Sequence, residues 1–396
     1  MSTSVDIPLQ DHTNGKFDAI ETPKSVKRVV NWPIVLAVVL IISILVFIIA
    51  FITVFFAIYG GIGVYGFNTI YAANPSVEGQ GCYNLNRAAN NPSNYRPSYC
   101  GSVNSSIPRY FLPQSNWSYV TFQSRTIKDE GAVDPSMRIK AILMLSNPDK
   151  DPFVIAVHGI RSCKESVIDN IAMLWKNGFN VLALDLRNHG ESEVSSKYPY
   201  ASFGNQEHWD VLGGLDYLLA NYPRLSNSSK NIGIFGESMG GSTATVTFAV
   251  DGGVNLNAAW LDAPAIYIRD TLYANIVMYG FDPNYVLSSV CSRSKIAWPY
   301  GCPPFRYDPE TLLSTIKPGR HVYFVSKTND KIVPINNSYR ASEKLIKQGV
   351  NVTTWFDIDL NQPSYCGSHC DMIGFKPDQY EQRMVSFFND HLVRLP

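Results

Sequence analysis

The longest hydrophobic stretch of the chain runs from Ile34 to Ile58 and contains no charged residue. The hydrocarbon core of a bilayer is roughly 30 Å thick, so a helix needs about 20 apolar residues to cross it. Trp32 and Tyr59 stand at the two ends, where aromatic rings favour the membrane interface. A cleaved signal peptide is disfavoured because the stretch is too long and follows a long polar tail. A buried core helix is the other alternative, but the lack of charge favours a transmembrane signal-anchor helix over residues 32–59.

The cations that flank this stretch are distributed unequally. The first cation after it is Arg87, whereas the preceding tail carries Lys16, Lys24, Lys27 and Arg28. Positive charge tends to stay on the cytoplasmic side of a membrane. We therefore expect a single-pass type II membrane protein with a cytoplasmic tail over residues 1–31. Residues 60–118 are rich in Gly, Asn, Pro, Ser and Tyr and are expected to form a lumenal or extracellular stalk or wrapping segment.

From about residue 119 onwards, short apolar runs alternate with helical patterns. The predicted strands are Ile139–Leu145, Phe153–His158, Val181–Asp185, Asn231–Gly236, Ala258–Asp262, His321–Ser326 and Val352–Ile358. The predicted helices are Ser166–Asn177, Glu207–Tyr222, Ser238–Val250, Asn337–Gln348 and Gln379–Val393. This alternation predicts an α/β domain over residues 119–396, with a mostly parallel central sheet flanked by helices. The interval between Asp262 and His321 is too long for one crossover and predicts a cap over about residues 263–318.

Composition supports a large folded domain outside the cytoplasm. Apolar residues make up 45% of the chain and charged residues 17%, and the formal net charge is 0, so we expect no nucleic-acid partner. All seven cysteines follow the apolar stretch, as do five Asn-x-Ser/Thr sites at Asn104, Asn116, Asn227, Asn336 and Asn351. We expect a glycoprotein with disulfide bonds. Sequence proximity favours the pairs Cys82–Cys100, Cys291–Cys302 and Cys366–Cys370 with Cys163 free, although connectivity cannot be deduced from sequence.

The sequence Gly-Glu-Ser-Met-Gly at residues 236–240 fits the G-x-S-x-G nucleophile elbow. In such an elbow the serine lies on a strained turn between a strand and a helix, and the flanking glycines let the two backbones come close. The apolar run before Ser238 and the small residues after Gly240 provide that context. We predict Ser238 as a nucleophile; a glycine-rich structural turn is the alternative.

A serine hydroxyl needs a base to accept its proton, and the base needs a carboxylate to orient it. His369 follows the last predicted strand and is the candidate base, with His391 and His321 as rivals. Asp330 follows the preceding strand and is the candidate acid, because this fold requires the order Ser, Asp, His. The rival acids are Asp262, Asp357 and Asp359.

The negative charge that develops on the substrate oxygen needs preorganised donors. We predict the backbone N–H groups of Ile160 and Met239 for this role, and a structural role for His158. No cofactor and no metal are expected. A zinc site at Cys366, His369 and Cys370 is the alternative, but a fourth ligand at suitable spacing is missing.

These motifs together resemble the α/β-hydrolase superfamily over roughly residues 119–396. The resemblance rests on His158-Gly159, the stretch 185–192, the elbow at 236–240, the stretch 328–334 and His369. It is most similar to small membrane-anchored serine hydrolases of the esterase and lipase branch and to prolyl-oligopeptidase-like enzymes. The resemblance implies an α/β-hydrolase fold and hydrolytic activity.

Three functions are compatible with these patterns. The leading hypothesis is a serine hydrolase that cleaves a carboxylic ester, a lipid ester included, through an acyl-enzyme on Ser238. The second is a peptidase or amidase of the same fold. The third is a catalytically silent hydrolase fold used for binding. The expected partners are the membrane and a small-molecule or lipid ester; the sequence leaves the oligomeric state open.

Overall fold

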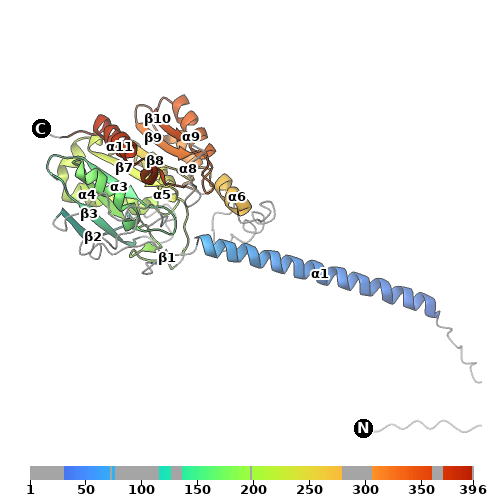
Figure 1. Cartoon of the computed structure of the whole chain (residues 1–396). Helices are drawn as coiled ribbons and strands as arrows, with labels where there is room; N and C mark the ends of the chain where they lie inside the picture. The colour runs from blue at the N-terminus through green and yellow to red at the C-terminus, as the bar shows by residue number, and fades with distance from the viewer. Residues whose placement is uncertain are drawn as a thin grey trace, which may run out of the picture. The chain divides into compact units, whose positions relative to one another are not determined.

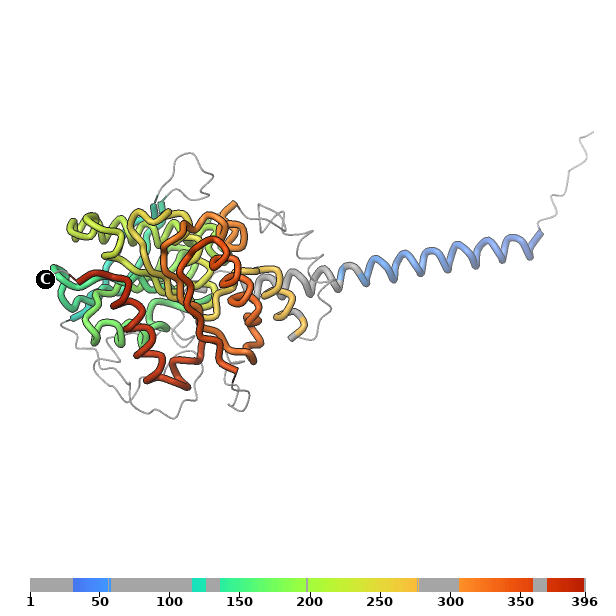
Figure 2. The backbone as a smooth tube through the Cα atoms, turned by 90° about the horizontal axis from the view of Figure 1, so that it is seen from above, coloured from blue at the N-terminus to red at the C-terminus, as the bar shows by residue number. Residues whose placement is uncertain are grey.

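The computed structural model describes residues 31–71, 74–75, 116–125, 136–196, 199–278, 306–358 and 369–394. The chain divides into two units, residues 1–56 and 57–396. The elements can be followed by label in Figure 1 and by colour in Figure 2.

The first unit contains most of helix α1, which runs from Trp32 to Tyr71. Its segment Trp32–Phe55 has a mean hydropathy of 3.5 with none of it buried, so it is long and apolar enough to cross a membrane. Side chains such as Phe47, which is 72% exposed, need an apolar environment that water does not provide. A membrane anchor and a signal sequence both fit these features. The helix continues past its predicted end at residue 59 into the segment that was expected to be a stalk. No proline, which would interrupt a helix, occurs in this segment before Tyr71.

The second unit is built on an eight-stranded sheet with the order β10-β9-β8-β7-β4-β5-β3-β2. Strand β3 runs antiparallel to both of its neighbours, and the remaining pairs are parallel. The strands are β2 (Trp117–Gln123), β3 (Arg138–Met144), β4 (Phe153–Val157), β5 (Asn180–Leu184), β7 (Ile232–Glu237), β8 (Leu256–Asp262), β9 (His321–Lys327) and β10 (Asn351–Asp357). A separate two-residue pairing joins β1 (Asn74–Pro75) to β6 (His189–Gly190).

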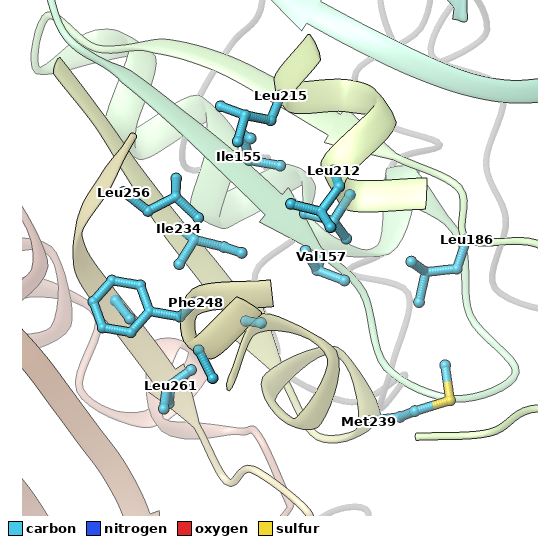
Figure 3. Packing of buried hydrophobic residues seen from close by; sticks show 14 of the residues in the cluster. Ile155, Val157, Leu186, Leu212, Leu215, Ile234, Met239, Phe248, Leu256 and Leu261 are labelled. Carbon is cyan, nitrogen blue, oxygen red and sulfur yellow. The ribbon is translucent and has the colours of Figure 1, made fainter. Parts of the chain in front are cut away.

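Helices cover both faces of the sheet. One core joins the sheet to α4 (His208–Asn221), α5 (Met239–Asp251) and α9 (Asn336–Lys347); Figure 3 shows part of it, including Ile155, Ile234 and Phe248. The opposite core joins the sheet to α3 (Ile168–Lys176) and α11 (Pro377–His391). Central strands are buried on both faces, which explains why their sequences are continuously apolar.

The predicted α/β-hydrolase fold is confirmed. All seven predicted strands and all five predicted helices are present, with ends displaced by at most two residues. Strand β2 was not predicted; it lies at the edge of the sheet, and only Trp117 and Phe122 of its residues are buried. The short helices α6 (Ile268–Met278) and α8 (Pro309–Leu312) lie within the predicted cap, and α10 (Met372–Phe375) precedes α11. The rest of the cap, residues 279–305, lies outside the described residues.

Two adjacent glycines in α4 provide a test of how closely this helix packs on β2. A Cβ atom on Gly213 would lie 2.3 Å from the carbonyl oxygen of Gln123, whereas one on Gly214 would lie 3.2 Å from side-chain atoms of Leu182 and Phe122. We expect Gly213→Ala to destabilise the domain by about 1–3 kcal/mol because backbone must move. Gly214→Ala is the matched control, with the same gain in helix propensity. Thermal unfolding followed by circular dichroism measures both; equal melting temperatures would contradict the close approach.

Candidate active site

Ser238 occupies the turn between β7 and α5 in a strained backbone conformation. Its φ of 54° and ψ of −121° lie where residues with a side chain are rarely found, and its side chain is 5% exposed. A Cβ atom on Gly240 would lie 2.3 Å from the carbonyl oxygen of Val157, and one on Gly236 would lie 2.3 Å from that of Gly240. Both glycines are therefore required by the close approach of strand and helix, as the elbow motif predicted.

Backbone hydrogen bonds fix this turn against the next strand. The Ser238 N–H donates to the carbonyl oxygen of Asp262 over 2.8 Å, and the Ala265 N–H donates to the Ser238 carbonyl over 3.3 Å. The hydroxyl of Ser242, one helical turn further on, donates to the carbonyl of Ala265 over 2.7 Å. The strained residue is thus held from both sides by the end of β8.

His369 and Asp330 form a buried pair. The two side chains are each 1% exposed, and His369 Nδ1 donates to Asp330 Oδ2 over 2.8 Å. The other carboxylate oxygen of Asp330 accepts the backbone N–H groups of Ile332 at 2.8 Å and Val333 at 2.9 Å. The carboxylate is therefore fixed, and its bond to Nδ1 leaves Nε2 as the nitrogen that can accept a proton.

Burial alone would lower the pKa of His369, but neighbouring carboxylates outweigh it. Asp330 and its hydrogen bond raise the pKa most, followed by the charges of Asp262 and Glu237, and the result is a pKa above the ordinary 6.5. His369 is therefore a stronger base than a solvated histidine.

The loop that carries His369 meets the serine turn at Asp262. The Cys370 thiol lies 3.8 Å from the same Asp262 carbonyl oxygen that accepts the Ser238 N–H, and 3.6 Å from His369 Nε2. Ser238, Asp330 and His369 follow β7, β9 and β10, so they all lie at the carboxyl end of the parallel sheet.

The rival histidines are placed elsewhere or already engaged. His321 begins β9, at the opposite end of that strand, and its ring stacks on His391 with centroids 3.6 Å apart. His158 hydrogen-bonds to the Gly159 carbonyl through Nδ1, and its Nε2 accepts the Leu186 N–H over 3.1 Å. Both ring nitrogens of His158 are thus used in structural contacts.

The rival carboxylates also have other partners. Asp357 binds Lys376 over 2.8 Å, and Asp262 accepts the hydroxyl of Tyr380 over 2.8 Å. Asp359 lies outside the described residues.

The segment after β4 lies against the serine, where oxyanion donors were predicted. A Cβ atom on Gly159 would lie 3.3 Å from Ser238 Cβ. Met239 is the first residue of α5, so its N–H has no partner within the helix. Ile160 follows Gly159 and packs against the core.

Two further acidic residues lie at this strand end: Asp262, which was a rival to Asp330 as the candidate acid, and Glu237, which was not considered. Burial and, to a smaller extent, the charge of Asp262 raise the pKa of Glu237 to about 8. Burial likewise raises the pKa of Asp262 to about 7, against the lowering effect of the Tyr380 hydroxyl. The available signal was their position: Asp262 ends a predicted strand and Glu237 directly follows another. The structure makes these two strands neighbours in the sheet.

A buried lysine braces the loop after β5 that borders this end of the sheet. Lys164 Nζ lies 2.8 Å from Asp185, 2.7 Å from Glu191 and 3.1 Å from Glu165. The Lys164 N–H also donates to Asp185 over 2.7 Å. These bonds tie the segment after β4 to the segment after β5.

The carboxylates around Lys164 also form a candidate metal site. Among the described residues, Cys163, Glu165 and Asp185 place ligand atoms within 4.8 Å of one another. The Lys164 ammonium group contacts both carboxylates, so an ion pair already satisfies them. Of the alternative zinc ligands, Cys366 lies outside the described residues and His369 is bonded to Asp330. The expected absence of a metal stays a prediction.

Two cysteine predictions were wrong. Cys370 is a free thiol, so the predicted Cys366–Cys370 bridge is not formed. Cys163, predicted free, is disulfide-bonded. Closeness in sequence does not bring two Cβ atoms within bonding reach, and the Cys370 thiol instead faces the Asp262 carbonyl and His369. The predicted pairs Cys82–Cys100 and Cys291–Cys302 lie outside the described residues.

Comparison with known proteins agrees with this fold. Residues 148–316 match the family described as Serine aminopeptidase, S33. An esterase from Pyrococcus furiosus superposes with a TM-score of 0.53 at 22% identity, covering 72% of this chain and 97% of the esterase. An acylaminoacyl peptidase from Pyrococcus horikoshii superposes with a TM-score of 0.51 at 13% identity, covering 71% of this chain and 43% of the peptidase. No curated protein sequence matches. The chain therefore has the α/β-hydrolase fold, and the part of it from residue 148 to residue 316 is similar to the serine aminopeptidase family.

Removing the buried lysine tests the brace beside the site. Lys164→Met keeps the volume but leaves the fully buried Asp185 carboxylate without its cation, and we expect a loss of about 3–5 kcal/mol in the free energy of unfolding. Arg340→Met is the control, because its ion pair with Asp270 is nearly half exposed and should contribute less than about 1 kcal/mol. Denaturant unfolding measures both. Equal losses in the two variants would show that the buried network contributes no more than a surface pair.

Proposed function

We propose that this protein is a serine hydrolase that cleaves a carboxylic ester through an acyl-enzyme on Ser238. The observation that carries the proposal is the 2.8 Å hydrogen bond between His369 and Asp330 at the strand end where Ser238 occupies a strained turn. A strained serine and a buried histidine–carboxylate pair at the same end of the sheet are costly to maintain, and such features cluster at active sites.

The proposed reaction has two halves. Ser238 Oγ attacks the ester carbonyl carbon while His369 Nε2 takes its proton, and Asp330 stabilises the imidazolium. The N–H groups of Ile160 and Met239 bind the oxyanion, and His369 then protonates the leaving alcohol. Water activated by His369 attacks the acyl-enzyme and releases the acid and the free serine.

A second candidate is hydrolysis of a peptide or aminoacyl amide. The family matched by residues 148–316 is described as a serine aminopeptidase, which favours this reading. We prefer an ester as the substrate because the apolar segment of α1 fits a membrane anchor. Such an anchor would hold the domain near lipid esters.

Active-site labelling tests the proposal. We expect a fluorophosphonate probe to label the wild-type chain. The labelling rate should fall at least about 100-fold in Ser238→Ala or His369→Ala, because both the nucleophile and its base are needed. Ser242→Ala is the control, since Ser242 binds the Ala265 carbonyl rather than a reacting group. Graded p-nitrophenyl esters compared with aminoacyl amides then separate the two substrate classes. A folded wild-type chain that is not labelled would favour a silent binding protein.

We also propose the type II orientation, with the hydrolase domain lumenal or extracellular. Three acceptor asparagines in the described residues, Asn227, Asn336 and Asn351, are exposed and could carry glycans. In a eukaryotic host we expect enzymatic removal of N-glycans to increase the electrophoretic mobility of the chain, and substitution of all five acceptor asparagines with Gln to abolish this shift. If the wild type shows no mobility shift and protease reaches the domain only from the cytoplasmic side, the orientation is opposite to the one proposed.

A further inference from the structure

Glu237 and Asp262 are paired residues on neighbouring parallel strands. They lie in register at the ends of β7 and β8, and neighbouring strands are about 4.8 Å apart. Phe235 and Trp260, two positions earlier on the same strands, both belong to the core beneath α3 and α11. Because side chains alternate along a strand, Glu237 and Asp262 point to this same side.

Neutral donors hold both carboxyl groups. Asp262 accepts the hydroxyl of Tyr380, which itself accepts the indole N–H of Trp260 over 3.1 Å and the amide of Asn170 over 3.3 Å. Glu237 accepts the backbone N–H of Gly159. Among the described residues no lysine or arginine forms an ion pair with either carboxyl group.

Burial disfavours ionisation of two carboxyl groups that lie side by side with no lysine or arginine partner. The charge of His369 lowers the pKa of each, but burial outweighs it. Burial raises the pKa of each, to about 8 for Glu237 and about 7 for Asp262. When two such groups interact strongly, their protons leave in two steps that belong to the pair.

His369 is the base beside this pair. Its other charged surroundings are Asp330 after β9 and, on its own loop, Asp371, which is paired with Lys327 over 3.2 Å. The neighbouring Cys370 thiol is kept protonated, because burial raises its pKa. The carboxyl pair is therefore the source of negative charge on the β7 and β8 side of His369.

We propose that Glu237 and Asp262 act as one carboxyl pair that holds a single proton near neutral pH, and that its remaining negative charge sets the pH at which His369 becomes a base. The two are positioning residues: they act through His369 and touch no reacting atom. Glu237 also accepts the N–H of Gly159, the residue before the proposed oxyanion donor Ile160. The inference rests on the proposed function of His369.

The pH profile of kcat/KM with a p-nitrophenyl ester tests the pair. Negative charge favours the imidazolium, so removing it should let His369 lose its proton at lower pH. We expect the double variant E237Q/D262N to move the acidic midpoint down by about one pH unit. Each single variant should move it much less, because the remaining carboxyl group, freed from its like-charged neighbour, ionises in its place. The control Asp216→Asn makes the same change at an exposed site and should cause no shift.

Two outcomes would overturn the proposal. A midpoint that stays in place in the double variant, even with a lower plateau, would leave the pair with only a structural role. Large and additive shifts in the single variants would show that the two groups ionise independently and share no proton. If the double variant does not fold, infrared spectra of the wild type and the single variants test the pair. The wild type should show a band of a protonated carboxyl group at neutral pH, and each single variant should lose it. A band that is unchanged in both single variants would refute the shared proton.

A readout without turnover separates this inference from the proposed function. Histidine-labelled full-length chain in detergent gives the pKa of His369 by NMR, with His369→Ala for assignment. The pKa should fall in the double variant whether or not the chain hydrolyses an ester. Loss of all activity with the NMR shift intact would refute the hydrolase alone, and activity with no shift would refute the pair alone.

Discussion

The hydrogen bond from the Ser238 N–H to the Asp262 carbonyl is the contact on which the rest of the site depends. Ser238 is held in a backbone conformation that costs about 1–3 kcal/mol, and such a residue persists only when its surroundings determine it. The bond fixes the turn to β8, and β8 is itself fixed between β7 and β9. The Cys370 thiol approaches the same carbonyl oxygen, so one backbone atom relates the serine turn to the histidine loop. Two loops that are far apart in the sequence therefore both contact the carbonyl oxygen of Asp262.

Buried charge is handled in two different ways at this end of the sheet. Around Asp185, the buried ammonium group of Lys164 contacts three carboxylates, which ties the loop after β5 to the segment after β4. Around His369, carboxyl groups collect without a matching number of cations: the buried pair Glu237 and Asp262 is held by hydroxyl and amide donors. The first arrangement suits a structural brace. The second raises the basicity of a histidine, which suits proton transfer.

The elbow, the strands and the order of the candidate residues could be predicted from the sequence because each is a local property. Gly236 and Gly240 are spaced for one turn, and the apolar runs that became β4, β5 and β7 are short and continuous because those strands are buried on both faces. Asp330 and His369 were placed by counting strands along the chain. Their contact over 2.8 Å agrees with that placement. Edge strand β2 was not predicted, although β10 at the opposite edge of the sheet was.

Contacts between distant segments were decided by the tertiary structure alone. Tyr380 and Asp262 are 118 positions apart, and they meet because α11 packs across the face of the sheet to which Asp262 points. The pairing of Glu237 with Asp262 depends on strand order, and the state of each cysteine depends on where the chain brings its sulfur. A sequence determines local geometry through steric and hydrophobic periodicity. Which buried charges become neighbours depends on how the sheet is assembled, because that alone sets their distances and their exclusion from water.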